Sequence, residues 1–74
     1  MPRKEVAYRD DKIRARMAAE RITQEQLAAR AGLTRQTINA IANGKVANVQ
    51  LPTLQAIADA LGLKLAELFD REAA

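Results

Sequence analysis

The stretch between Gln24 and Asn43 carries side chains suited to recognising another molecule. Four of its residues have planar, forked side chains whose spacing places them near one face of a helix: Arg35, Gln36, Asn39 and Asn43. Such side chains can bond base edges, arginine to guanine and the amides to adenine. An ordinary surface helix more often carries Glu and Lys pairs, yet no acidic residue lies between Glu25 and Asp59. The pattern favours binding to a polyanion that presents specific hydrogen-bond donors and acceptors.

Charge is distributed unevenly along the sequence. Residues 1–45 hold ten Lys and Arg against five Asp and Glu, whereas residues 46–74 hold two against four. One sign of charge on one part of a small domain favours an anionic partner. A solvated basic surface that maintains solubility explains the same pattern.

The residue types that are missing narrow the functional classes. The 74 residues include no His, Ser, Cys or Trp, so the usual nucleophiles, general base and metal ligands are absent. A domain of this size is also too small for a deep pocket, so we expect no enzyme activity, cofactor or metal. The lack of cysteine fits a cytoplasmic protein. No apolar run approaches the ~20 residues that span a bilayer, so we expect no membrane partner.

Two central helices joined by a short turn must position the polar face. Thr23 and Gln26 have the spacing of a capping box, which predicts the start of a helix. Gly32 suits its left-handed end. Thr34 is expected to cap the next helix, which runs to Asn43.

The remaining apolar spacing predicts three further helices and no strand, and thus an all-α fold. The first is expected to be capped by Asp10 or Asp11 and to reach about Glu20. The fourth begins near Pro52 and ends at Gly62, and a short fifth follows. The large apolar residues of these last two helices belong to the core or to a dimer surface: Leu54, Ile57, Leu61, Leu65, Leu68 and Phe69.

These elements divide the chain into three parts. Residues 1–9 lack a helical pattern and are expected to form a flexible or extended N-terminal arm. Residues 10–70 form the domain, and residues 71–74 are expected to fray.

Two segments match a known family: ITQEQLAARAGLTRQTINAIANGK and LPTLQAIADALGLKLAELF. They resemble the helix-turn-helix domain of phage repressor and Cro type, also called the Xre family, and the resemblance runs from about Ile13 to Phe69. It implies a compact five-helix bundle of the lambda-repressor-like DNA-binding kind. The helix from Thr34 to Asn43 is then expected to lie in the major groove of double-stranded DNA.

The resemblance also implies roles for individual residues. The base-reading positions of the family correspond to Arg35, Gln36 and Asn39. Positions that contact the DNA backbone correspond to Gln24, Thr34, Thr37, Asn43 and Lys45. Helix N-termini offer free amides to anions, and phosphate contacts set register while base contacts set sequence. The alternative is that these are solvated polar residues, or that Asn43 serves only the turn.

The sequence departs from the family pattern at several positions outside the polar face. The family often has an Arg at the position of Met17 and a Glu at that of Ala42. We predict that Met17 packs near Ala42 instead, because burying two charges is costly. The usual Gly before the second helix is Arg21, and the usual Ser cap of the last helix is Lys64. Both changes weaken local turn chemistry.

The resemblance implies a sequence-specific transcription regulator, expected to be a repressor, that binds a near-palindromic operator as a homodimer. One helix buries little area, and a dimer places two such helices roughly 34 Å apart on the DNA. The alternatives are an antitoxin that neutralises a partner toxin and autoregulates its operon, or a restriction-modification controller. Arg3, Lys4 and Arg9 of the arm either reach DNA or remain disordered.

Overall fold

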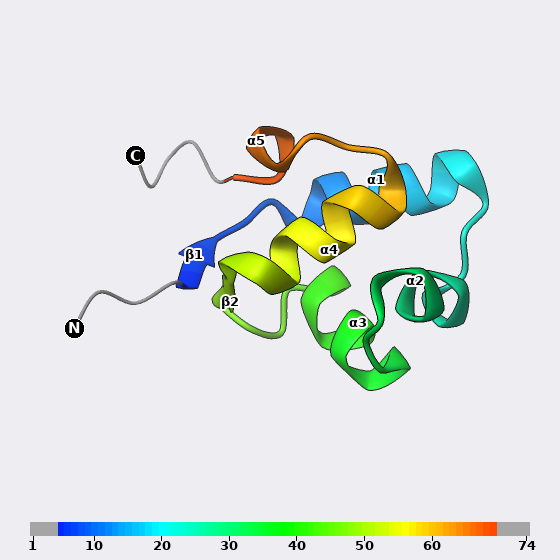
Figure 1. Cartoon of the computed structure of the whole chain (residues 1–74), viewed down its shortest axis with the longest axis horizontal. Coiled ribbons are helices and arrows are strands. Elements are labelled where there is room, and N and C mark those ends of the chain that lie inside the picture. The colour runs from blue at the N-terminus through cyan, green and yellow to red at the C-terminus, as the bar shows by residue number, and fades with distance from the viewer. Residues whose placement is uncertain (1–4, 70–74) are drawn as a thin grey trace.

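Five helices make up most of the part of the chain that the computed structural model describes, residues 5–69 (Figure 1). They are α1 (Asp10–Glu20), α2 (Gln24–Ala31), α3 (Arg35–Ala42), α4 (Leu51–Leu61) and α5 (Leu65–Leu68). Two short strands complete the fold, β1 (Glu5–Ala7) before α1 and β2 (Asn48–Gln50) between α3 and α4. The predicted order and number of helices are confirmed.

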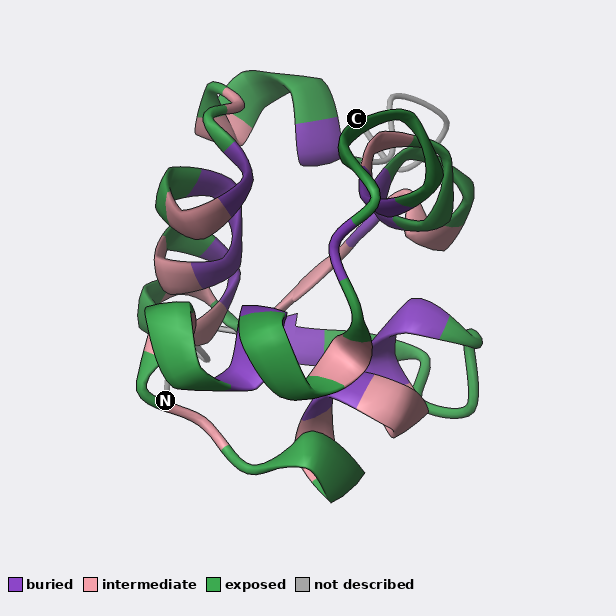
Figure 2. Cartoon of the chain, turned by 90° about the vertical axis from the view of Figure 1, so that its right-hand side faces the viewer, coloured by how far each residue is buried: buried purple, intermediate pink, exposed green. Residues whose placement is uncertain are grey.

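Helix α4 lies in the middle of the molecule and contacts α1, α2, α5 and β2 (Figure 1). Its predicted apolar stripe is buried, and Leu54, Ile57 and Ala58 are fully inaccessible to solvent. The buried segments of the other helices face the same interior (Figure 2). Burial of this stripe is the main stabilising term, at about 1.5–3 kcal/mol for each large aliphatic side chain. The sequence did not decide whether the apolar residues of the fifth helix belong to the core or to a dimer surface. Leu68 is buried, Leu65 is partly buried and Phe69 is exposed.

The turns around α2 follow from their sequence. The Thr23 hydroxyl accepts a hydrogen bond from the Gln26 backbone N–H at 3.0 Å, and the Thr23 N–H donates to the Gln26 side chain at 2.9 Å. This is the predicted capping box. Gly32 ends α2 in the left-handed conformation at φ 71°. Thr34 then caps α3 by accepting from the Thr37 N–H at 3.1 Å, as predicted.

The predicted cap of α1 is wrong. Arg9 occupies the N-cap position without a side-chain capping bond, and Asp10 and Asp11 lie inside the first turn. The two carboxylates therefore face the positive end of the helix dipole instead of bonding its first amides. Arg21 ends α1 in the left-handed conformation at φ 54°, a geometry that glycine adopts at lower cost.

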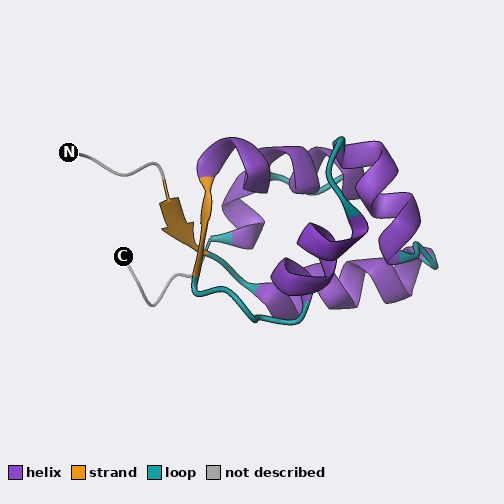
Figure 3. Cartoon of the chain, turned by 90° about the horizontal axis from the view of Figure 1, so that it is seen from below, coloured by secondary structure: helices purple, strands orange, loops and turns teal. Residues whose placement is uncertain are grey.

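The expectation of no strand is also wrong. Strands β1 and β2 pair antiparallel, with Val6 opposite Val49, and form a small sheet at one end of the molecule (Figure 3). Tyr8 is buried next to them, and its hydroxyl donates to the Ile41 carbonyl oxygen at 2.7 Å. The segment from Glu5 to Tyr8 is thus extended and attached to the domain. The arm residues Arg3 and Lys4 and the expected frayed end lie outside the described residues.

Met17 and Ala42 are both buried in the common core, as their predicted packing requires. A neighbouring arginine supplies a polar link between the same two helices. Arg14 pairs with Asp10 and donates to the Ala42 carbonyl oxygen at 2.8 Å, at the C-terminal end of α3. A cation at that end also complements the helix dipole.

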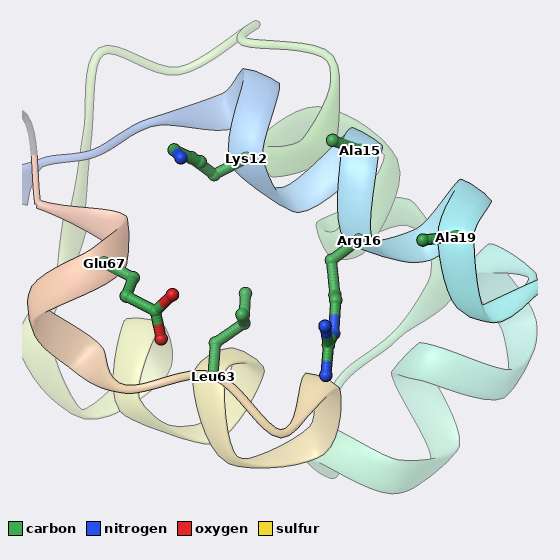
Figure 4. A pocket seen from close by; sticks show the side chains of 6 residues that line it. All are labelled: Lys12, Ala15, Arg16, Ala19, Leu63 and Glu67. Atoms are coloured by element: carbon green, nitrogen blue, oxygen red, sulfur yellow. The ribbon is translucent and has the colours of Figure 1, made fainter.

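A second arginine connects α1 to the end of α4. The Arg16 Nε donates to the Leu61 carbonyl oxygen at 3.1 Å. Figure 4 shows this side chain extending from α1 past Leu63, and both line an open depression together with Ala15 and Ala19 of α1. Between residues 5 and 69 no helix is long and apolar enough to cross a membrane.

Candidate DNA-binding surface

Helices α2 and α3 pack on each other through their apolar sides, which leaves their polar sides exposed. Leu27 and Ala28 of α2 are buried, as are Ile38 and Ile41 of α3. Three residues, Gly32 to Thr34, connect the helices. This geometry leaves Arg35 and Gln36 of α3 exposed and Asn39 and Ala40 partly exposed.

An open depression lies on the exposed side, between the start of α2 and the middle of α3. It is lined by Gln24, Arg35, Gln36, Asn39, Ala40 and Lys45. Five of these six are predicted site residues that the fold brings together. Ala40 is the one lining residue to which the sequence analysis gave no role. Its small side chain keeps the depression open between its longer neighbours.

Arg35 and Gln36 are exposed on this surface. Within the described part of the chain, neither side chain makes a hydrogen bond or an ion pair to another residue. Their donors and acceptors are therefore available to an external partner. No element between residues 5 and 69 covers them.

Asn39 is bonded differently from these two residues. It is half-buried, and its Nδ2 donates to the Gln24 Oε1 at 3.1 Å. Its Oδ1 accepts from the Lys45 Nζ at 3.1 Å. Asn39 thus links the first residue of α2 to the loop that follows α3. Sequence reasoning missed this chain of bonds because its members lie 15 and 6 positions apart in different elements.

Three further predicted site residues lie outside the depression. The Thr34 hydroxyl accepts from the Thr37 N–H and also donates to the Thr37 hydroxyl at 2.9 Å, so capping occupies much of its capacity. Asn43 is exposed at the C-cap of α3. It sits beside Gly44, in the turn that sequence reasoning gave as the alternative to a backbone contact.

The charged side chains that line the depression are both basic, Arg35 and Lys45. The segment from Gln26 to Ala58 carries Arg30, Arg35 and Lys45 and no acidic residue. The first turn of α3 likewise contains no acid. A phosphate placed in the depression therefore meets no carboxylate among the lining residues, and the nearest acid in sequence is Glu25, next to Gln24 in the first turn of α2.

Two packed helices joined by a tight turn, with the second exposing a row of polar side chains, form a helix-turn-helix. The family model of the Cro/C1-type HTH DNA-binding domain matches residues 12–74, and the chain belongs to this family. The fold is also similar to the crystal structure of a hypothetical transcription factor, NHTF, from Neisseria. That similarity has a TM-score of 0.72 at 26% sequence identity and covers 86% of this chain and 73% of the other. A search of curated proteins gave no match.

Proposed function

We propose that this protein is a sequence-specific transcription regulator, acting as a repressor, that reads double-stranded DNA with α3 in the major groove. The observation that carries the proposal is that Arg35 and Gln36 are exposed, make no side-chain bond within residues 5–69, and line a depression without an acidic residue. Arginine bonds guanine and glutamine bonds adenine through two parallel hydrogen bonds each. The similarity to a transcription factor supports the regulatory part of the proposal.

The residues around this pair suit the DNA backbone. Gln24 begins α2 and Thr34 caps α3, so both stand where helix N-termini present amides to an anion. Lys45 supplies a cation at the edge of the depression. Thr37 and Asn43 complete the proposed phosphate-contacting set. These contacts would fix the register of α3 against the bases.

A homodimer on a near-palindromic operator accounts for how so small a surface achieves useful affinity. A single module of this type buries little area on DNA and binds weakly. Two copies related by a two-fold axis present two α3 helices to successive major grooves, roughly 34 Å apart. Sedimentation of the protein with operator DNA tests this, and we expect two chains per duplex. A hetero-complex with a second kind of chain would instead favour the antitoxin alternative.

Selection of random duplexes on the purified protein tests the proposal as a whole. We expect enrichment of one motif with two inverted half-sites and binding that weakens steeply as salt rises. Equal retention of all sequences would contradict sequence-specific reading. A reporter fused to the selected site then tests repression, because bound protein should lower its transcription.

A further inference from the structure

The chain of bonds from Lys45 through Asn39 to Gln24 has a fixed direction. A lysine ammonium can only donate hydrogen bonds, so the atom of Asn39 that faces Lys45 must be the acceptor Oδ1. The donor Nδ2 of Asn39 then faces Gln24 and requires the acceptor Oε1 there. The Nε2 of Gln24, with its two N–H donors, is left for a partner outside the chain.

This direction matters for an anionic partner. An amide side chain whose orientation is not fixed can present either its oxygen or its nitrogen. An oxygen presented to a phosphate would repel it, whereas an N–H donates to it. Holding the amide of Gln24 in one orientation therefore prepares a donor at the first residue of α2, beside the positive end of that helix.

We propose that Asn39 is a positioning residue that orients Gln24 and Lys45 toward DNA phosphates, and that it does not itself read a base. The proposal rests on the proposed function, in which Gln24 and Lys45 contact the backbone. It differs from the role that family resemblance implies for this position.

The competing base-reading role conflicts with the bonds of Asn39. A specific contact to adenine uses the Oδ1 and the Nδ2 of one asparagine together. Here each atom already has one partner inside the chain and the residue is half-buried, so the remaining N–H and lone pair of the amide are held in the orientation that Gln24 and Lys45 set. Arg35 and Gln36 on the same helix have no such partners within residues 5–69. The structure thus separates two free readers from one anchored amide.

The first test replaces Asn39 by Ala and measures binding to the selected operator, to single-base variants of it and at several salt concentrations. We expect operator binding to weaken about 5-fold to 10-fold, because the variant loses the hydrogen bonds that hold Gln24 and Lys45 in place. The same factor should apply to every operator variant. The salt slope should not change, because Lys45 keeps its charge. Relaxed preference at one operator position would overturn the proposal and restore Asn39 as a reader.

The second test is a mutant cycle. If Asn39 acts through Gln24 and Lys45, adding Asn39→Ala to the variant Gln24→Ala/Lys45→Ala should weaken binding by no more than about 2-fold. If the losses of affinity caused by the separate substitutions multiplied instead, the proposal would be overturned. Gln55→Ala is the matched control, since Gln55 also donates to a neighbouring side chain, Asp59, at 2.8 Å but on α4. It should bind like the wild type.

These outcomes are distinct from failure of the proposed function. A wild-type protein that enriches no motif would refute sequence-specific reading before any variant is compared. A wild-type protein that enriches a motif, with Asn39→Ala altering that motif, would refute only the positioning role. Circular dichroism melting of each variant confirms that the compared proteins are folded, and Asn39→Ser serves in place of Asn39→Ala if the latter unfolds.

Discussion

Two adjacent residues, Arg35 and Gln36, are expected to provide most of the discrimination between base pairs. Both are exposed and are the first two residues of α3. Their free donors and acceptors have no function inside residues 5–69. A surface with only two free readers in each copy should specify few base pairs strongly, so most of the specificity of the operator would come from having two half-sites.

Gln36→Ala should relax base preference at one position of each half-site. The expected loss of discrimination is about 1–3 kcal/mol, the worth of one bidentate contact to a base. Repeating the duplex selection with the variant measures it. An unchanged motif at every position would remove Gln36 as a reader. Gln55→Ala, an amide lost from α4, is again the control.

Lys45→Ala should weaken binding to all sequences alike and should flatten the dependence on salt. Loss of one phosphate contact lowers the slope of log K against log salt by about 0.9. Titrations of operator and unrelated duplexes at several salt concentrations give both quantities. Arg30→Ala removes an equal charge from the last turn of α2, outside the depression, and should change the slope less. Equal slopes for wild type and Lys45→Ala would exclude the contact.

The residues of the surface could be predicted from sequence, but their bonding could not. Helical spacing and the missing acids indicated which side chains of α3 face outward. Whether such a side chain is free depends on atoms contributed by other elements. For Asn39 these atoms come from Gln24 and Lys45, and their approach follows from the crossing of α2 and α3.

At the scale of elements, turn chemistry decides where the helices end. The ends of α2 and α4 have glycine in the left-handed conformation, whereas α1 has Arg21 there at φ 54°. A left-handed residue with a Cβ costs roughly 1–2 kcal/mol more than one in the ordinary region. The departure from the family glycine thus places strain just before the helix-turn-helix.

Arg21→Gly should stabilise the fold. The relief of strain is partly offset by the extra freedom of glycine in the unfolded chain, so we expect a gain of about 0.5–1 kcal/mol in the free energy of unfolding. Urea denaturation measures it. Arg21→Ala retains the Cβ and removes only the guanidinium, and should give no such gain. A stabilisation of equal size in both variants would attribute the effect to charge.

Gly44→Ala should destabilise the fold by more than Gly32→Ala does. Both glycines have positive φ, at 68° and 71°, so both variants carry the same backbone strain. A Cβ at Gly44 would approach the Asp10 Oδ2 to 2.8 Å, whereas one at Gly32 meets nothing within 4 Å. Asp10 is held by its ion pair with Arg14 and cannot yield freely. We expect an additional loss of about 1 kcal/mol, measured by denaturation.

The variant Asp10→Ala tests that explanation. With the carboxylate absent, the two glycine substitutions should cost the same. A persisting difference would place the contact elsewhere.

Helices and caps with local signals were predictable, whereas the strands were not. Thr23 and Gln26 lie three positions apart, so their hydrogen bonds can be predicted from a short segment of sequence. Strands β1 and β2 contain three residues each, and Val6 pairs with Val49 across most of the chain. Three residues cannot display an alternating pattern, and pairing over such a separation depends on where α1 to α3 place the two segments.

For the whole molecule, that small sheet determines how the N-terminal segment is attached to the DNA-binding helices. Tyr8 follows β1 directly, and its hydroxyl donates to the carbonyl oxygen of Ile41 near the end of α3 at 2.7 Å and lies 3.2 Å from that of Val46 in the following loop. Arg9 donates its backbone N–H to the Leu68 carbonyl oxygen at 2.7 Å, which joins the same segment to the end of α5. The N-terminal segment of the described chain therefore contacts both the end of α3 and the end of α5.

Tyr8→Phe tests this attachment through both stability and pH. Loss of the buried hydroxyl leaves the Ile41 carbonyl oxygen without that donor, so the variant should lose about 1–2 kcal/mol of unfolding free energy near neutral pH. Burial, and secondarily the charge of Asp10, raises the pKa of the Tyr8 hydroxyl above its ordinary value. The unfolded chain therefore releases this proton at a lower pH than the folded chain does. The stabilisation is complete below the unfolded pKa of about 10 and is lost as pH rises through the higher folded value.

Denaturation curves of wild type and Tyr8→Phe at increasing pH separate this effect from the titration of lysines, which both proteins share. The difference in stability between them should be constant up to about pH 9 and then shrink. A difference that grew with pH would mean that the folded state favours the ionised phenol, and so that the hydroxyl is not held as a donor between α3 and the sheet. The attachment of the N-terminal segment would then depend on the pairing of β1 with β2 and on the ring of Tyr8 alone.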